Sequence, residues 1–529
     1  MSTLPVLPLP RRKLPIGIQT FEKIREEDYY YVDKTGLALD LIDQGTCYFL
    51  SRPRRFGKSL FLDTLKNLFE GNKSLFSGLA AETRWNWDIR YPVIRVSFSD
   101  GVLRDRAELD QRIRDILRVN REALGQTLPP NLPESDVAGS FADLIRQAHH
   151  MTGQRAVVLI DEYDKPILDN ITHSPVALEM REGLKNLYSV LKGADEHLKF
   201  VFLTGVSKFS KVSLFSGLNN LTDLTLDPRY SALCGYTDAD VDRVFAPELP
   251  GLDRTRIREW YNGYNWLGES VYNPFDLLLL FRNREFRPYW FETGTPTFLV
   301  KLLTQRQVFT PDLERLVALE TLLSTFDVDN IPTEALMFQA GYLTIDTVRR
   351  LPGMMQITLR YPNQEVRSSL NGALLQVMSH DPARHGILAP RLYDLLLEND
   401  FEGMKTLFTA FFDGIPHQWF TKNPISHYEG YYASVFYSYF AALGLDLSTE
   451  KSSNAGRLDM ALRFNAHVYL FEFKVVELAP EGRALQQIKD KGYAKPYQAL
   501  GQPIHLIGVE FSKTSRNVVG FEVETLPIQ

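Results

Sequence analysis

The sequence predicts an α/β protein whose N-terminal half is a doubly wound parallel sheet. Short apolar runs in this half end in polar or glycine-containing turns, which favours buried strands over buried helices. Segments with helical periodicity lie between the runs, and such alternation indicates a parallel sheet with ligands at the carboxyl ends of its strands. The expected strands are residues 47–50, 93–98, 157–160 and 200–203, and the expected helices include residues 59–70 and 107–124.

The remainder of the chain predicts two further regions. After residue 237, helical periodicity is followed by a hairpin over residues 341–345 and 355–359, which gives the outline of a winged helix. Helical periodicity returns over residues 392–412, and the C-terminal part then changes to a helix, a hairpin and a helix. A chain of 529 residues is too long for one core, so we expect about three domains. Their expected bounds are residues 14–236, 237–415 and 416–529.

The composition is that of an ordinary globular protein, with 44% hydrophobic and 23% charged residues. The net charge of -6 excludes a protein that coats nucleic acid through global positive charge, so any such contact needs a local basic patch. The chain has two cysteines, Cys47 and Cys234, and neither belongs to a CxxC motif or to a Cys/His pattern spaced for metal binding. This argues against a disulfide scaffold and against structural zinc. Neither a signal peptide nor a membrane-spanning apolar stretch is present. We therefore expect a soluble cytoplasmic protein without a membrane partner.

A phosphate-binding loop is predicted directly after the first strand. Backbone N–H groups at the start of the following helix would bind anions, Lys58 would reach the β- and γ-phosphates, and Ser59 would ligate magnesium. Arg52 occupies the first glycine position of the usual pattern G-x-x-x-x-G-K-[ST]. The expected nucleotide-binding residues of this loop are Arg55, Phe56, Gly57, Lys58, Ser59 and Leu60.

A second motif, Asp161-Glu162, follows the strand at residues 157–160. Asp161 would hold magnesium and Glu162 would polarise the attacking water, although a solvated acidic turn would have the same letters. Both motifs together, in a strand–helix alternation, favour a site for ATP and Mg²⁺. Thr204, which follows the strand expected over residues 200–203, either senses the γ-phosphate or merely caps the strand. Residues 29–31, three tyrosines, either stack on adenine or pack against the sheet.

A second site is predicted near the C-terminus, on two strands joined by a short turn. Glu472 and Lys474 point to one face of their strand. Apolar residues flank them on that face, and burying unpaired charges there costs free energy, so we expect the two charges to serve a function. Asp459 and Glu472 are hard oxygen ligands suited to magnesium, and Lys474 could activate water. An Asp/Glu/Lys ion-pair cluster is the alternative. The preceding helix carries Glu429, and lysines on the following helix either face a phosphate backbone or are simply solvated.

These and other motifs resemble the AAA-ATPase-like family of prokaryotic proteins, whose members typically carry a C-terminal PD-(D/E)xK nuclease-like domain. The resemblance covers nearly the whole chain after Lys13. It implies a P-loop NTPase domain of AAA-like fold and a C-terminal α/β domain of restriction-endonuclease-like fold. By this resemblance, Asp459, Glu472 and Lys474 match the catalytic core, Glu429 the helical acidic position, and Gln487 the glutamine of the following helix. The matching segments are residues 16–21, 31–35, 52–59, 161–164, 215–223, 261–264, 341–344 and 362–366.

Together, the residues and the resemblance predict an ATP-regulated, magnesium-dependent nuclease. Its expected substrate is nucleic acid, with DNA favoured over RNA, and its expected role is defence against foreign DNA. A homo-oligomer is compatible with this expectation. The main alternative is a nucleotide-switched signalling or scaffold protein whose nuclease-like domain binds nucleic acid without cutting it. A metabolic kinase has no support from the C-terminal half.

Overall fold

The structure is a computed structural model of the 529-residue chain. The chain forms two compact units, one comprising Met1–Gly294 and Val317–Asn363 and the other Thr295–Leu316 and Gln364–Gln529. We call them the N-terminal unit and the C-terminal unit. The expected division into three domains stays a prediction. The structure describes residues 10–127, 133, 136–208, 214–215, 220–294, 299–300, 302–303, 306, 308, 310–324, 332–378, 382–413, 429–449, 452–453, 456–457 and 459–527.

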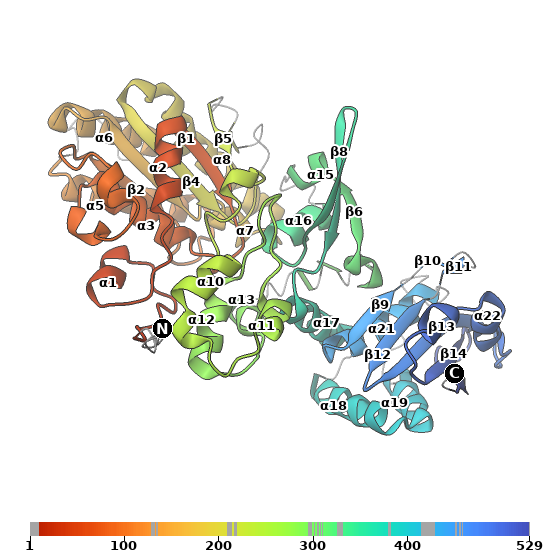
Figure 1. Ribbon diagram of the computed structural model, residues 1–529. Helices are drawn as coiled ribbons and strands as arrows, with labels where there is room; N and C mark the ends of the chain where they lie inside the picture. The colour runs from red at the N-terminus through yellow and green to blue at the C-terminus, as the bar shows by residue number, and fades with distance from the viewer. Residues whose placement is uncertain are drawn as a thin grey trace, which may run out of the picture. The chain divides into compact units, whose positions relative to one another are not determined.

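The N-terminal unit contains a five-stranded parallel sheet with the order β2-β3-β4-β1-β5. The four predicted strands are confirmed, and their apolar runs follow from burial on both faces of a parallel sheet. Strand β4 lies between β1 and β3 and pairs with both, so all three strands end at one edge (Figure 1). The bounds are β1 Cys47–Ser51, β2 Val93–Ser97, β3 Ala156–Asp161, β4 Leu198–Gly205 and β5 Thr222–Asp223.

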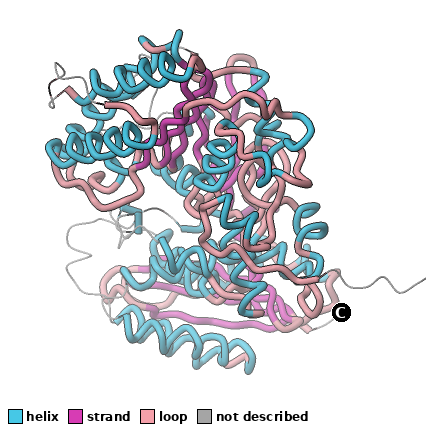
Figure 2. The backbone as a smooth tube through the Cα atoms, turned by 90° about the vertical axis from the view of Figure 1, so that its left-hand side faces the viewer, coloured by secondary structure: helices cyan, strands magenta, loops and turns pink. Residues whose placement is uncertain are grey.

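Helices lie on both sides of this sheet, as Figure 2 shows for its magenta strands. Helix α3 begins at Lys58, shortly after β1 ends, and packs against β3 and β4. The helices predicted over residues 59–70 and 107–124 are confirmed as α3 and α5, each one residue earlier. The bounds are α1 Phe21–Glu26, α2 Thr35–Gln44, α3 Lys58–Phe69, α4 Ala81–Arg84, α5 Arg106–Ala123, α6 Val137–Thr152, α7 Lys165–Leu168 and α8 Ser174–Gly193.

The same unit continues in a group of short helices and a small sheet. Asn273 caps α12 by accepting from the N–H of Phe275, and Pro274 occupies the first turn, where its missing N–H costs nothing. The predicted hairpin is confirmed, and its turn uses Gly353 at φ +82°. The small sheet has the order β6-β8-β7. The bounds are α10 Asp238–Val244, α11 Arg254–Tyr261, α12 Pro274–Asn283, α13 Tyr289–Gly294, β6 Leu316–Leu319, α15 Glu320–Ser324, α16 Thr333–Ala340, β7 Thr344–Leu351 and β8 Met354–Arg360.

The C-terminal unit contains a mixed five-stranded sheet with the order β15-β14-β13-β12-β9. Strand β13 is antiparallel to β12 and parallel to β14. One face packs on the aromatic side chains of α21, and the other packs on α22. The bounds are α17 Gln364–Met378, α18 Pro382–Glu398, α19 Phe401–Asp413, α21 Glu429–Ala442, β9 Asp446–Thr449, β12 Met460–Phe464, β13 His467–Val476, α22 Arg483–Lys491, α23 Lys495–Gln498, β14 Ile504–Ser512 and β15 Val518–Leu526.

The helical pattern predicted over residues 392–412 is confirmed, and it is divided by a break that was not predicted. The periodicity over residues 392–412 continues through two helices, because Asn399 adopts a left-handed φ of 54° that ends α18. Asp400 then caps α19 by accepting from the N–H of Gly403 at 2.8 Å. Apolar spacing persisted across the break because both helices bury residues in the same core.

Candidate functional site

The loop between β1 and α3 has the geometry of an anion-binding turn. Arg55 and Gly57 adopt positive φ angles of 68° and 89°, which let the chain turn sharply into the helix. The N-terminal cap of α3 makes no side-chain hydrogen bond, so its first N–H groups have no capping side chain. Phe56 is buried and anchors the loop against the rings of Tyr264 and Trp266, with centroids 4.8 and 5.5 Å away.

Lys58 is held beneath this loop. Its Nζ donates to the carbonyl oxygens of Arg52 and Pro53, both at 2.8 Å. Burial lowers the pKa of the Lys58 ammonium, and the nearby Asp161 carboxylate opposes that shift. An ammonium has three donors, and two are used by the loop itself. The third is available to a phosphate.

Arg52 is completely buried and does not line the cavity next to the loop. Its guanidinium donates to the carbonyl oxygens of Ser51 and Thr225 and lies 4.0 Å over the ring of Trp266. Burial lowers its pKa to about 10. The arginine at the first glycine position therefore ties the loop to the segment after β5.

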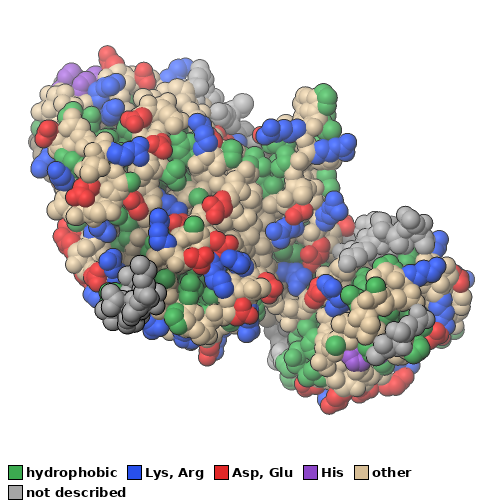
Figure 3. Space-filling model, in the orientation of Figure 1, with side chains coloured by type: hydrophobic (Ala, Val, Ile, Leu, Met, Phe, Trp, Pro, Cys, Tyr) green, Lys and Arg blue, Asp and Glu red, His purple; other side chains and the backbone are tan. Residues whose placement is uncertain are grey.

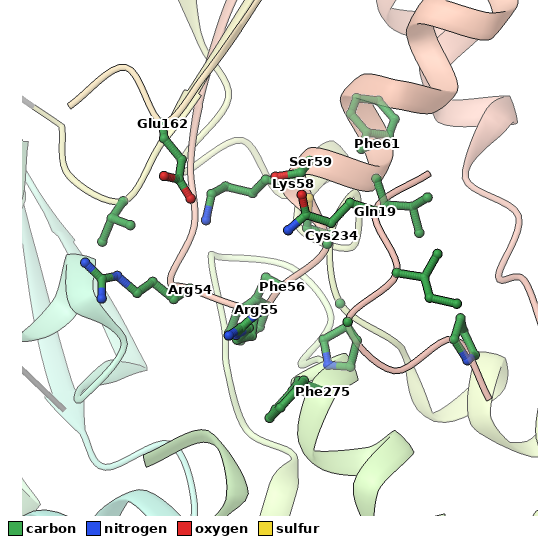
Figure 4. Close-up of a pocket in the computed structure, with 18 of the residues that line it drawn as sticks. Gln19, Arg54, Arg55, Phe56, Lys58, Ser59, Phe61, Glu162, Cys234 and Phe275 are labelled. Atoms are coloured by element: carbon green, nitrogen blue, oxygen red, sulfur yellow. The ribbon is translucent and has the colours of Figure 1, made fainter. Parts of the chain in front are cut away.

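A cavity of about 490 Å³ opens beside the loop, entirely within the N-terminal unit. This is within the usual range for small-molecule sites. All six predicted loop residues line it, from Arg55 to Leu60. Figure 4 shows Lys58, Ser59 and Glu162 on one side and Phe275 on another. Of the three predicted tyrosines, Tyr30 and Tyr31 line the cavity, whereas Tyr29 does not.

Asp161 and Thr204 lie at the ends of the neighbouring strands β3 and β4. Neither lines the cavity, and both are buried. Asp161 Oδ1 and Thr204 Oγ1 have no hydrogen-bond partner among the described residues, which is unusual for buried polar atoms. The described residues contain no group of three or more His, Cys, Asp or Glu side chains that could hold a metal ion. Magnesium in nucleotide sites needs fewer, because phosphates and water supply the other ligands, so Ser59 and Asp161 fit that role.

Glu162 has a strained backbone at the cavity wall. Its φ of 51° is left-handed, which is uncommon for a residue other than glycine and costs free energy. The conformation places its carboxylate in the cavity, toward Lys58 and Arg54 (Figure 4). Burial, followed by the charge of Asp161, raises the pKa of Glu162. Strain of this kind is typical of functional residues.

Two further residues at this site were not assigned from the sequence. Arg54 is exposed and lines the cavity, and its charge opposes the rise in the pKa of Glu162. Asp164 is buried and accepts from the backbone N–H groups of Val206 and Ser207, and burial raises its pKa to about 6. The only sequence signals were the repeated arginines of the loop and the second aspartate of Asp161-Glu162-Tyr163-Asp164.

In the C-terminal unit, the structure brings together Asp459, Glu472, Lys474 and Gln487. Asp459 directly precedes β12, and the pairing of Met460 with Phe471 places it next to the middle of β13. Asp459 Oδ2 accepts from the N–H of Phe473 at 2.8 Å. Lys474 Nζ lies 3.3 Å from Glu472 Oε1, and the side-chain amide of Gln487 donates to the same oxygen.

The carboxyl of Glu472 is buried and strongly perturbed. It is 1% exposed, and its Oε2 atom has no hydrogen-bond partner among the described residues. Burial, and then the charge of Asp459, raises the pKa of Glu472 to about 8. Two neighbouring carboxyls with a partnerless buried oxygen suit a hard divalent cation, which would stabilise both negative charges.

Glu510 was missed by the sequence analysis, although it supports this site. It is buried on β14, opposite Lys474. Its carboxylate accepts from four successive N–H groups at the start of α22, the helix that carries Gln487. The donors are Glu481, Gly482, Arg483 and Ala484, at distances of 2.5–3.3 Å. No sequence signal identified it, because the contact spans different elements.

The other residues expected near this site are Glu429 and the lysines that follow β13. Glu429 is the first residue of α21, and its side chain lies outside the described residues. On α22, Lys489 forms an ion pair with Glu524, so its charge is balanced within the unit. Lys495, expected on the same helix, begins the separate helix α23, because Gly492 ends α22 in a left-handed conformation.

Comparisons with known proteins identify the same two domains. Residues 15–215 match the family described as "Predicted AAA-ATPase", and residues 427–521 match the PD-(D/E)XK nuclease superfamily. A relative from Azotobacter chroococcum mcd 1, named "Uncharacterized protein in vnfD 5'region", is 65% identical over 517 residues. These cover 98% of this chain and 99% of the relative. The resemblance inferred from the motifs is thereby confirmed. Among the described residues, no helix has the length and apolar character needed to span a membrane.

Proposed function

Because the chain belongs to the AAA-ATPase-like family and carries a C-terminal domain of the PD-(D/E)XK nuclease superfamily, we propose that it is an ATP-regulated, magnesium-dependent nuclease. The observation that carries this proposal is the buried Glu472 carboxyl, which meets Asp459, Lys474 and Gln487 while one oxygen has no partner. DNA is the proposed substrate. The buried free cysteines Cys47 and Cys234 fit a reducing cytoplasm.

In the nucleotide site, each residue has a role that follows from its position. The N-terminal amides of α3 and the Lys58 ammonium bind the phosphates, and Ser59 with Asp161 would hold magnesium. Glu162 accepts a proton from the attacking water, and its raised pKa brings it closer to that task. Thr204, which lies between the two motifs with a partnerless hydroxyl, is suited to respond to the γ-phosphate.

In the nuclease site, Asp459 and Glu472 would hold magnesium, which supplies a low-pKa water and stabilises charge on the phosphate. Lys474 and Gln487 both donate to Glu472 Oε1 and so fix the orientation of that carboxylate. The remaining oxygen, Oε2, is then directed away from protein donors and toward a ligand. Lys474 is partly exposed and can also orient water near the phosphate.

Cleavage assays on variants test this proposal. Asp459→Ala and Lys474→Ala should each abolish magnesium-dependent cleavage of labelled DNA while ATP binding is retained. Lys513→Ala is the matched control, because Lys513 is a surface residue of the same unit paired with Glu477. A wild-type protein that cuts neither DNA nor RNA with magnesium or manganese, with and without ATP, would contradict the nuclease proposal.

A second function, a nucleotide-switched scaffold that binds nucleic acid without cutting, is favoured by one observation. Glu472 Oε1 already has two donors, so the cluster is partly satisfied by protein groups alone. For such a structural cluster, Asp459→Ala and Lys474→Ala would lower the thermal midpoint of unfolding. Added magnesium would then leave the midpoint of the wild type unchanged.

A further inference from the structure

In the hairpin formed by β7 and β8, strand β7 exposes both of its faces over residues 346–350. Residues 346–350 of β7 are all exposed. Successive side chains of a strand point to opposite faces, so five exposed residues in a row require solvent on both sides. Figure 1 shows the hairpin extending beyond α15 and α16 of its own unit. The buried side chains of the hairpin include Thr344 and Ile345 on β7 and Ile357 and Leu359 on β8, and Ile357 lies opposite Val348.

The distal half of the hairpin is basic and has no balancing charge. Arg349 and Arg350 are exposed and form no ion pair with any described residue. As neighbours on one strand, they project from opposite faces. Arg360, nearer the base of the hairpin, differs from these two arginines because it forms an ion pair with Asp346 at 3.0 Å. Figure 3 shows Lys and Arg side chains on both sides of the hairpin, which stands out in a chain whose net charge is -6.

Large apolar side chains accompany these arginines. Met354 is 52% exposed and Val348 is 36% exposed. On β6, which pairs with β8, Val317 is 54% exposed. Exposed apolar groups next to unpaired cations indicate a contact surface rather than a surface that only maintains solubility.

Helix α16, which precedes the hairpin, is not available for the same contact. Five of its side chains are buried, Ala335 to Gln339. Gln339 also donates to the carbonyl oxygen of Leu323 and accepts from the N–H of Lys208. A partner that approaches this small sheet therefore meets the hairpin and not the helix.

We propose that the β7–β8 hairpin is a docking surface for double-stranded DNA. The proposal rests on the proposed function, since a nuclease acts on nucleic acid that the chain must hold. A two-stranded ribbon fits the major groove of B-form DNA, which is about 12 Å wide. Arg349 and Arg350, directed to opposite sides, then meet phosphates on the two walls of the groove. A protein partner would need acidic groups on both sides of the ribbon, whereas a DNA groove has phosphates along both of its walls.

Fluorescence anisotropy with a labelled DNA duplex, in EDTA so that no cutting occurs, tests the proposal on the full chain. Arg349→Glu with Arg350→Glu should weaken binding at least about tenfold and reduce the salt dependence by roughly two phosphate contacts. Arg349→Lys with Arg350→Lys should retain most of the affinity, because the charges remain. Arg114→Glu with Arg118→Glu is the control, since both residues lie on the outer side of α5 and bond within that helix.

Three results would overturn the proposal: unchanged affinity of the hairpin variant, an equal loss in the control, or no duplex binding by the wild type. Tighter binding of duplex RNA through the same arginines would overturn the assignment to DNA. The outcome is separable from that of the nuclease proposal. Hairpin-dependent binding without any cleavage contradicts only the nuclease proposal, and cleavage with hairpin-independent binding contradicts only this one.

Discussion

At the scale of single residues, the nucleotide site contains a residue with a strained backbone, Glu162, and lies beside a buried arginine, Arg52. Glu162 adopts a left-handed backbone conformation, and its side chain lines the cavity. Arg52 differs from Glu162, because its buried guanidinium donates to backbone carbonyl groups and packs over the ring of Trp266. The sequence could show that Arg52 departs from the usual glycine but not where it points. That direction depends on Thr225 and Trp266, which are distant in the chain.

Glu162→Gln should bind ATP like the parent but lose hydrolysis. The amide keeps the shape of the side chain and cannot accept a proton from water as a carboxylate does. Titration calorimetry measures binding and phosphate release measures turnover, with Glu179→Gln on the exposed side of α8 as the control. Hydrolysis at the parent rate would exclude Glu162 as the base and make Asp164 the next candidate, since its pKa is raised to about 6.

Magnesium binding at the nuclease site should strengthen as the pH rises toward about 8 and then level off. The pKa of Glu472 is raised to about 8, so its carboxyl holds a proton at neutral pH and must release it to ligate a metal. Calorimetry across this range should show proton release on binding, and Glu472→Gln should remove the pH dependence. Magnesium affinity that is flat with pH would contradict this assignment.

The raised pKa of Glu472 also determines how the free energy of unfolding of the metal-free protein depends on pH. The unfolded chain releases the Glu472 proton near the ordinary pKa of 4.5, whereas the folded chain keeps it up to about pH 8. The folded state therefore binds more protons in this window, and rising pH lowers the free energy of unfolding.

At the scale of elements, the strands were predictable and their order was not. Strands β1, β3 and β4 appear in the sequence as continuous apolar runs because both faces are buried. The insertion of β4 between β1 and β3, which brings Thr204 between the two motifs, is set by pairing and leaves no local pattern. The break after α18 was missed for a similar reason, since apolar spacing continues across it.

Helix α22 offers a test at this scale, because Glu510 holds its first turn. Glu510→Ala leaves four N–H groups without their acceptor and should displace Gln487 from Glu472. Cleavage should fall at least about tenfold in kcat with a smaller change in KM, and Glu510→Gln should restore part of it. Glu522→Ala, an exposed acid on β15, is the control. An unchanged kcat would exclude a positioning role for Glu510.

At the scale of the whole molecule, both candidate sites could be proposed from the sequence because each consists of short motifs at the ends of strands. The structure places Lys58 near Asp161, and Asp459 near Glu472. The supports of each site were not predictable, since Arg52 and Glu510 act through contacts between distant segments. Regulation of cleavage by ATP is the proposed link between the two sites.

The most direct test measures cleavage of labelled DNA by the full chain with and without ATP, in the parent and in Lys58→Ala. Loss of the Lys58 ammonium should weaken ATP binding at least about tenfold, roughly 1.4 kcal/mol. Lys66→Ala, at the other end of α3, is the control because Lys66 only pairs with Glu70. The account predicts magnesium-dependent cleavage that changes with ATP in the parent and in the Lys66 control, and no longer changes in Lys58→Ala. Cleavage with the same response to ATP in all three proteins, or no response in the parent, would contradict it.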